Sequence, residues 1–75
     1  MVLNKVKLNT NCIIKEMKNI DEKIKIRLME LGLIDGCVVK VVKKSILKKT
    51  LLIFFNSTCF TLKDNLANEI VVEYA

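Results

Sequence analysis

The sequence predicts a mainly β fold, a small barrel of about five strands with one α-helix inserted after the first strand. Short β-branched and aromatic segments recur after Gly36, helix end signals precede that glycine, and turn-prone residues separate the segments. With 75 residues the chain has room for one core. We therefore expect residues 1–75 to form a single domain.

Five segments have the composition of strands, because β-branched and aromatic residues favour a pleated surface. They are residues 12–17, 37–42, 51–55, 59–62 and 70–74. Asn56-Ser57-Thr58 is expected to make the tight connection between the third and fourth strands. Before the last strand, residues 64–68 are expected to form one helical turn.

The segment after the first strand is ambiguous from periodicity alone, because apolar and polar residues alternate over positions 24–28. Its ends favour a helix. Asn19 and Glu22 have the spacing of a capping box, and Gly32 can supply the left-handed residue that stops a helix. These signals predict a helix over about residues 20–31.

On that helix, at 100° per residue, one apolar stripe is expected to face the core. It comprises Ile20, Ile24, Leu28 and Leu31. Leu33 follows Gly32, where it can touch Leu28 across the helix end. Arg27 falls inside the stripe, so its stem is expected to pack while its guanidinium meets carbonyls or a carboxylate; the alternative is a contact with a partner.

The composition, with 52% hydrophobic and 28% charged residues, is typical of a packed protein. The longest apolar run, Leu51–Phe55, is far shorter than the roughly 20 residues that cross a bilayer. No early stretch has the basic start, apolar centre and cleavage site of a secretory signal. We therefore expect a cytoplasmic protein that does not span a membrane.

Metal and catalytic sites are not expected. The chain has no histidine and no closely spaced pair of ligands, which argues against an iron site. Cys12, Cys37 and Cys59 lack CxxC spacing and are expected to fill the core. No nucleophile adjoins a base and no glycine-rich phosphate loop exists, so we predict a non-enzyme with no evident cofactor and no small-molecule substrate.

The net charge of +5 favours an acidic partner, nucleic acid or an anionic membrane surface without selecting one. The lysines are spread along the chain, as on a solubilising surface. The four aromatic residues are expected mostly in the core: Phe54, Phe55, Phe60 and Tyr74. A basic nucleic-acid-binding module is therefore the weaker alternative.

One sequence pattern carries a family resemblance. The run Arg27-Leu-Met-Glu-Leu-Gly-Leu33, followed by Gly36 and an apolar strand, resembles the signature of the ferrous iron transport protein A (FeoA) family. Segments 59–62 and 70–72 stand where that family's last strands would stand, so the resemblance covers roughly residues 8–74. This chain departs from the family pattern at two places: Asn11 stands where a glycine is usual, and residues 45–50 lack the usual proline and glycine.

The resemblance implies an SH3-like barrel with a helix between the first two strands. It also implies an accessory role beside FeoB, a membrane ferrous iron permease with a cytosolic GTP-binding domain. Ferrous iron would be the cargo of that pathway, and the chain would reach the inner face of the membrane through its partner. The same barrel occurs as the last domain of iron-dependent repressors, so a stand-alone relative of that domain is an alternative.

The end of the predicted helix is the candidate partner surface. Apolar side chains on its polar side, together with those after the cap, can form an exposed patch; the alternative is that the loop 45–50 covers them. We expect the partner-binding residues to be Ile26, Met29, Leu31, Gly32, Leu33 and Ile34. Arg27, Gly32 and Gly36 are assigned structural roles. Exposed strand edges also allow a homo-oligomer, which the sequence does not select.

Overall fold

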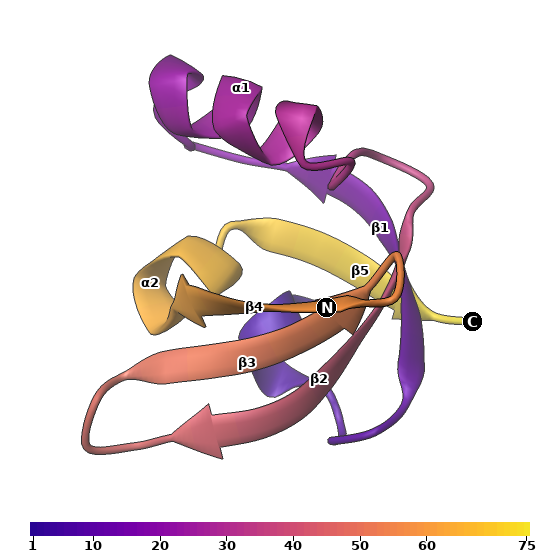
Figure 1. Cartoon of the computed structure of the whole chain (residues 1–75), viewed down its shortest axis with the longest axis vertical. Coiled ribbons are helices and arrows are strands. Elements are labelled where there is room, and N and C mark those ends of the chain that lie inside the picture. The colour runs from indigo at the N-terminus through magenta and orange to yellow at the C-terminus, as the bar shows by residue number, and fades with distance from the viewer.

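The computed structural model describes residues 1–75 as one five-stranded antiparallel sheet with two helices and a 3-10 turn (Figure 1). The elements are η1 Leu3–Lys5, β1 Asn11–Met17, α1 Glu22–Glu30, β2 Val38–Ser45, β3 Thr50–Phe55, β4 Thr58–Lys63, α2 Asp64–Ala67 and β5 Ile70–Tyr74. The strand order is β4-β3-β2-β1-β5. The predicted mainly β class, the five strands and the single helix after the first strand are confirmed.

The connection between β3 and β4 is as tight as the sequence predicts. Asn56 and Ser57 both take positive φ angles, 51° and 60°. This conformation matches the right-handed twist of a hairpin and lets Phe55 pair directly with Thr58. The predicted helical turn before β5 is confirmed as α2.

Two bulges bend the sheet on itself. The register shifts by one residue at Lys15 in β1 and at Val42 in β2. The enclosed side of the sheet carries the hydrophobic core, to which the N-terminal segment adds Leu3 and Val6. The buried core residues are Leu3, Val6, Cys12, Ile14, Leu28, Leu33, Val39, Val41, Leu51, Ile53, Phe55, Leu62, Ala67, Ile70 and Val72.

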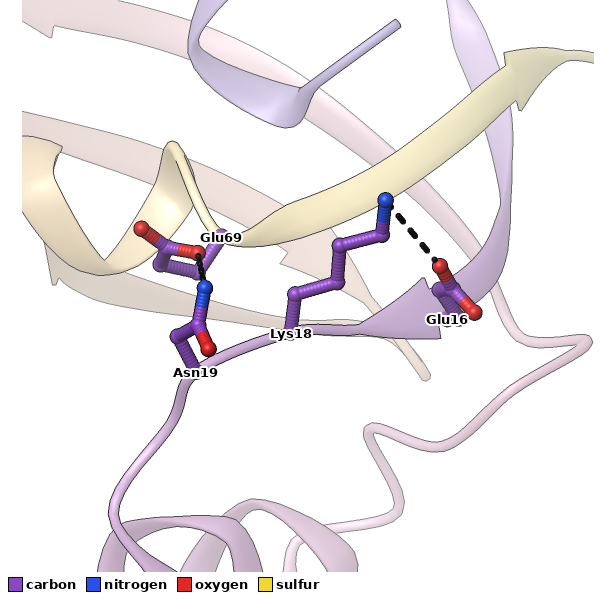
Figure 2. Close-up of polar contacts among 4 residues, drawn as sticks. All are labelled: Glu16, Lys18, Asn19 and Glu69. Carbon is purple, nitrogen blue, oxygen red and sulfur yellow. Dashed lines mark hydrogen bonds and ion pairs between the residues drawn. The ribbon is translucent and has the colours of Figure 1, made fainter.

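The segment that enters α1 differs from the prediction. Asp21, not Asn19, is the residue that precedes the helix, and no side chain caps it, so the predicted capping box is wrong. Asn19 has a φ of 45°, and its Nδ2 lies 3.5 Å from Oε2 of Glu69 (Figure 2). The backbone N–H of Lys18 also donates to the carbonyl of Glu69, at 2.7 Å. Asn19 is thus used to attach this segment to the start of β5.

The expected core stripe of α1 is wrong for two of its four residues. Leu28 is buried and Ile20 is half-buried against the core, but Ile24 and Leu31 are 41% and 44% exposed. The physical reason is that the strands and the N-terminal segment already supply almost all of the core. The helix therefore lies outside the sheet (Figure 1), with Leu28 as its one buried side chain.

The three cysteines differ in burial. Cys12 is buried, Cys37 is half-buried and Cys59 is exposed, and all three are free thiols. Core filling is confirmed for Cys12 and wrong for Cys59, which lies opposite Phe54 on the outer side of the β3–β4 pair. Burial raises the pKa of the Cys12 thiol because a thiolate there would lose its hydration.

Neither helix of this chain has both the length and the apolar character that a membrane span requires.

Candidate protein-interaction surface

The end of α1 is fixed by its backbone. Gly32, with φ +95°, donates its N–H to the carbonyl of Met29, and Leu33 donates to the carbonyl of Leu28, at 3.0 and 2.8 Å. These are the two bonds of a Schellman motif, which needs a left-handed residue at the glycine position. The predicted helix stop at Gly32 is confirmed.

Leu33 follows the cap into the core. It is only 1% exposed and, with Leu28, belongs to the buried cluster, so the predicted contact across the cap is confirmed. The prediction that Leu33 is a partner-binding residue is wrong, because a buried side chain cannot belong to an exposed partner surface. The reason is the motif itself, which commonly turns the second residue after the cap back against the helix.

The other apolar residues around the helix end are exposed. Ile26, Met29, Leu31 and Ile34 lie between 44% and 54% exposed. Ile24, on the preceding turn, is 41% exposed. A helix of nine residues with one buried side chain is therefore apolar on several sides and is largely uncovered.

The loop between β2 and β3 does not cover these residues. Its apolar side chains, Ile46 and Leu47, are 90% and 97% exposed. In Figure 1 this loop lies at the lower left, whereas α1 lies at the top of the molecule. The alternative that residues 45–50 fold over Ile26 and Met29 is therefore wrong.

A groove of about 230 Å³ separates α1 from the sheet. Its walls are mainly apolar: Ile24, Arg27, Leu28, Leu31, Leu33, Ile53, Phe55, Phe60, Thr61 and Leu62. The rings of Phe55 and Phe60 lie 5.2 Å apart at its sheet side. The groove continues the exposed apolar surface of α1 and offers a recess for an apolar side chain.

Arg27 stands at the rim of this groove, exposed, and makes no ion pair or side-chain hydrogen bond. The expected contact of its guanidinium with a carbonyl or carboxylate is therefore wrong. Because the helix side is uncovered, water can hydrate the charge. Gly36 has φ +90°, and its N–H donates to the carbonyl of Ile14 at 2.7 Å, which attaches the segment after the helix to β1.

The side chains that line the groove are mostly apolar, and Arg27 is the one charged residue among them. No three His, Cys, Asp or Glu side chains come together in the chain. Of the aromatic residues, Phe55 is buried and Phe60 is half-buried, but Phe54 and Tyr74 are 40% and 42% exposed. The sequence predicted the helix end as a surface but not the groove, because the groove depends on how far α1 lies from the sheet.

Family and structural comparisons agree with this architecture. The model of the FeoA domain matches residues 1–74. The chain belongs to the FeoA family. The solution structure of the FeoA protein from Chlorobium tepidum is 26% identical, with a TM-score of 0.89 over 99% of this chain and 70% of that one. No curated protein is similar enough to count as a match.

A second FeoA, from Stenotrophomonas maltophilia, is 29% identical and has a TM-score of 0.79, covering 97% of this chain and 89% of that one. That protein, solved with zinc, is described as an SH3 domain protein and as a suggested activating factor of bacterial ferrous iron transport. The predicted SH3-like fold is thus confirmed. The manganese regulator SloR, 12% identical, shares the fold alone, with a TM-score of 0.83 over the whole chain and 34% of its own length.

Proposed function

We propose that this FeoA protein is a non-catalytic accessory protein of ferrous iron transport that binds the cytosolic part of a FeoB-type permease through α1 and the turn after it. The observation that carries the proposal is the exposure of Ile26, Met29, Leu31 and Ile34 on one helix and its C-terminal turn. Exposed apolar patches of this kind mark protein-interaction sites. Membership of the FeoA family supplies the link to iron transport.

The exposure and backbone contacts of these residues support a division of roles on the proposed surface. Ile26, Met29, Leu31 and Ile34 would lose water on binding, which is the main driving force for association. Gly32 and the buried Leu33 hold the turn in place. The groove between α1 and the β3–β4 pair would take an apolar side chain of the partner.

Binding a cytosolic domain of a permease would place the protein at the inner face of the membrane. Iron then remains the cargo of the partner rather than a ligand of this chain. Binding of single-stranded nucleic acid commonly uses aromatic platforms for the bases, but the exposed rings, Phe54 and Tyr74, come from different strands, β3 and β5, which are not neighbours in the sheet.

The test is an NMR titration of the isotopically labelled protein with the cytosolic domain of the permease. The expected result is saturable binding, with amide shift changes concentrated in α1, in residues 31–34 and on the groove side of β4. Absence of binding, or shifts confined to the far side of the sheet, would overturn the proposal. Oligonucleotide binding that weakens steeply with salt would favour the nucleic-acid alternative instead.

A further inference from the structure

The charges of this protein are separated along the chain. Residues 36–63 contain six lysines and no acidic residue, for a formal charge of +6. The other 47 residues carry seven Lys or Arg and eight Asp or Glu, for a formal charge of −1. The net charge of +5 therefore resides in β2, β3, β4 and their turns.

The turn between β2 and β3 combines this charge with the two most exposed large apolar residues of the chain. Ile46 and Leu47 are 90% and 97% exposed. Four lysines lie close to them in the sequence, two before Ser45 and two after Leu47: Lys43, Lys44, Lys48 and Lys49. An aliphatic pair between basic residues is the composition of a segment that binds anionic membrane surfaces.

The turn is a defined structure. Ser45 and Thr50 pair at its base, and the N–H of Lys48 donates to Oγ of Ser45 at 3.3 Å. Lys49 takes a left-handed φ of 54° and accepts a bond at its carbonyl from the N–H of Asp64, at 2.9 Å. The aliphatic pair is thus held at the tip of a closed hairpin, which reduces the entropy lost on binding.

The lysines lie on both sides of this hairpin. On one side Lys43 and Lys48 line a depression of about 320 Å³ whose other residues are Ser45, Thr50, Leu52 and Thr61. On the other side Lys44 and Lys49 share a depression with Asp64, and Nζ of Lys44 donates to the carbonyl of Asn4. The first side has ammonium and hydroxyl donors with no carboxylate, which suits a phosphate group.

We propose that the β2–β3 hairpin binds directly to anionic phospholipid bilayers, with Ile46 and Leu47 entering the interface and Lys43 and Lys48 contacting lipid phosphates. The tip carries no aromatic ring on which a nucleic-acid base could stack. A projecting aliphatic pair can also enter a fluid bilayer directly, whereas a protein partner would need a complementary groove to accept it. The hairpin and α1 lie at opposite ends of the molecule (Figure 1), so a membrane and a protein partner can be bound together.

A single-tryptophan reporter tests the insertion step, because the chain contains no tryptophan. Leu47→Trp is mixed with vesicles of phosphatidylcholine alone, or of phosphatidylcholine with phosphatidylglycerol. We expect a blue-shifted, brighter emission only with the anionic vesicles, and no shift for the matched reporter Ile26→Trp on α1. A silent Leu47→Trp, or equal shifts in both vesicle types, would overturn the proposal.

Vesicle co-sedimentation measures the contributions of the two parts of the hairpin. Lys43→Gln with Lys48→Gln should weaken binding by about fivefold per lysine, and Ile46→Ser with Leu47→Ser by roughly tenfold. The control, Lys23→Gln with Lys25→Gln on α1, should leave binding unchanged. Equal losses in both lysine pairs would refute a specific hairpin site, as would hairpin variants that bind vesicles normally but lose oligonucleotide binding.

The vesicle experiments contain no permease, so a negative result in them does not bear on the proposed function. A negative result in the permease titration likewise does not bear on the membrane proposal. The hairpin variants should fold, because Ile46 and Leu47 contribute almost no buried surface. Their denaturation midpoints are measured alongside the vesicle binding.

Discussion

Strand β3 and helix α1 are both rich in apolar residues, but they use them differently. In β3, Leu51, Ile53 and Phe55 are buried, in strict alternation with less buried neighbours. In α1, only Leu28 is buried, while Ile24, Ile26 and Met29 remain more than 40% exposed. The apolar residues of the sheet therefore stabilise the fold. Those of the helix remain available for binding.

The difference originates in how the two elements are attached. Strand β3 is paired on both sides, so its period of two places alternate side chains in the core. Helix α1 is attached mainly at its ends, through the segment at Asn19 and the cap at Gly32, and through Leu28 between them. The sheet should therefore respond to core mutations as a unit, and the helix should respond locally.

The largest effect is expected in the sheet. Ile53→Ala removes a side chain with no exposed surface from the centre of the core. The loss of burial and the cavity left behind should cost about 3 to 4 kcal/mol, most of the stability of a domain of this size. Urea denaturation followed by circular dichroism measures the loss. A cost below about 1 kcal/mol would show that the core is not the main source of stability.

A smaller and more local effect is expected for Leu28→Ala, because Leu28 is the one buried side chain of α1. The cost should be about 2 kcal/mol, at the lower end for such a truncation, since the groove beside Leu28 is already open to solvent. Hydrogen exchange should become faster in α1 than in β3. Equal acceleration in both elements would contradict the local attachment of the helix.

The helix end is expected to contribute less again. Gly32→Val places a β-branched residue at φ +95° and should cost about 1 kcal/mol or more. The Cβ itself has room, because it would lie 4.0 Å from the ring of Phe55. The control Gly32→Asn should lose less, since asparagine tolerates the left-handed region. Equal losses in thermal denaturation would exclude backbone strain as the cause.

The smallest effect comes from the buried thiol. Because the pKa of Cys12 is raised in the folded state above its ordinary value of 9.0, the unfolded chain releases this proton first as the pH rises. The contribution of Cys12 to stability is therefore present below that value and is lost at higher pH. Cys12→Ala should show a shallower decline of stability in alkaline solution than the wild type. Parallel declines would contradict the burial effect.

Much of the fold could be predicted, because its signals are local. Gly32 has the left-handed conformation that its place after an apolar run indicates, and Asn56-Ser57 forms the expected tight turn. Alternating and β-branched segments likewise located all five strands. In each case the residues that carry the signal are the residues that adopt the structure.

The failed predictions depend on distant contacts. Asn19 has the spacing for a capping box, but its side chain donates a hydrogen bond to Glu69, 50 residues away (Figure 2). The helical wheel placed Ile24 and Leu31 correctly on one side of α1, but it could not show that the core was already filled by other elements. Leu33 is buried because the cap turns it back against the helix, although its sequence neighbours Leu31 and Ile34 are exposed.

In the proposed function, the exposed apolar surface of α1 binds the partner. The most direct test is the affinity of Met29→Asp for the cytosolic domain of the permease, measured by calorimetry beside the control Leu8→Asp. The two side chains are similarly exposed, at 54% and 45%, so each substitution should change the free energy of unfolding by only about 0.5 kcal/mol. The account predicts at least about a tenfold loss of affinity for Met29→Asp alone. A folded Met29→Asp protein that binds the permease domain as tightly as Leu8→Asp and the wild type would contradict it.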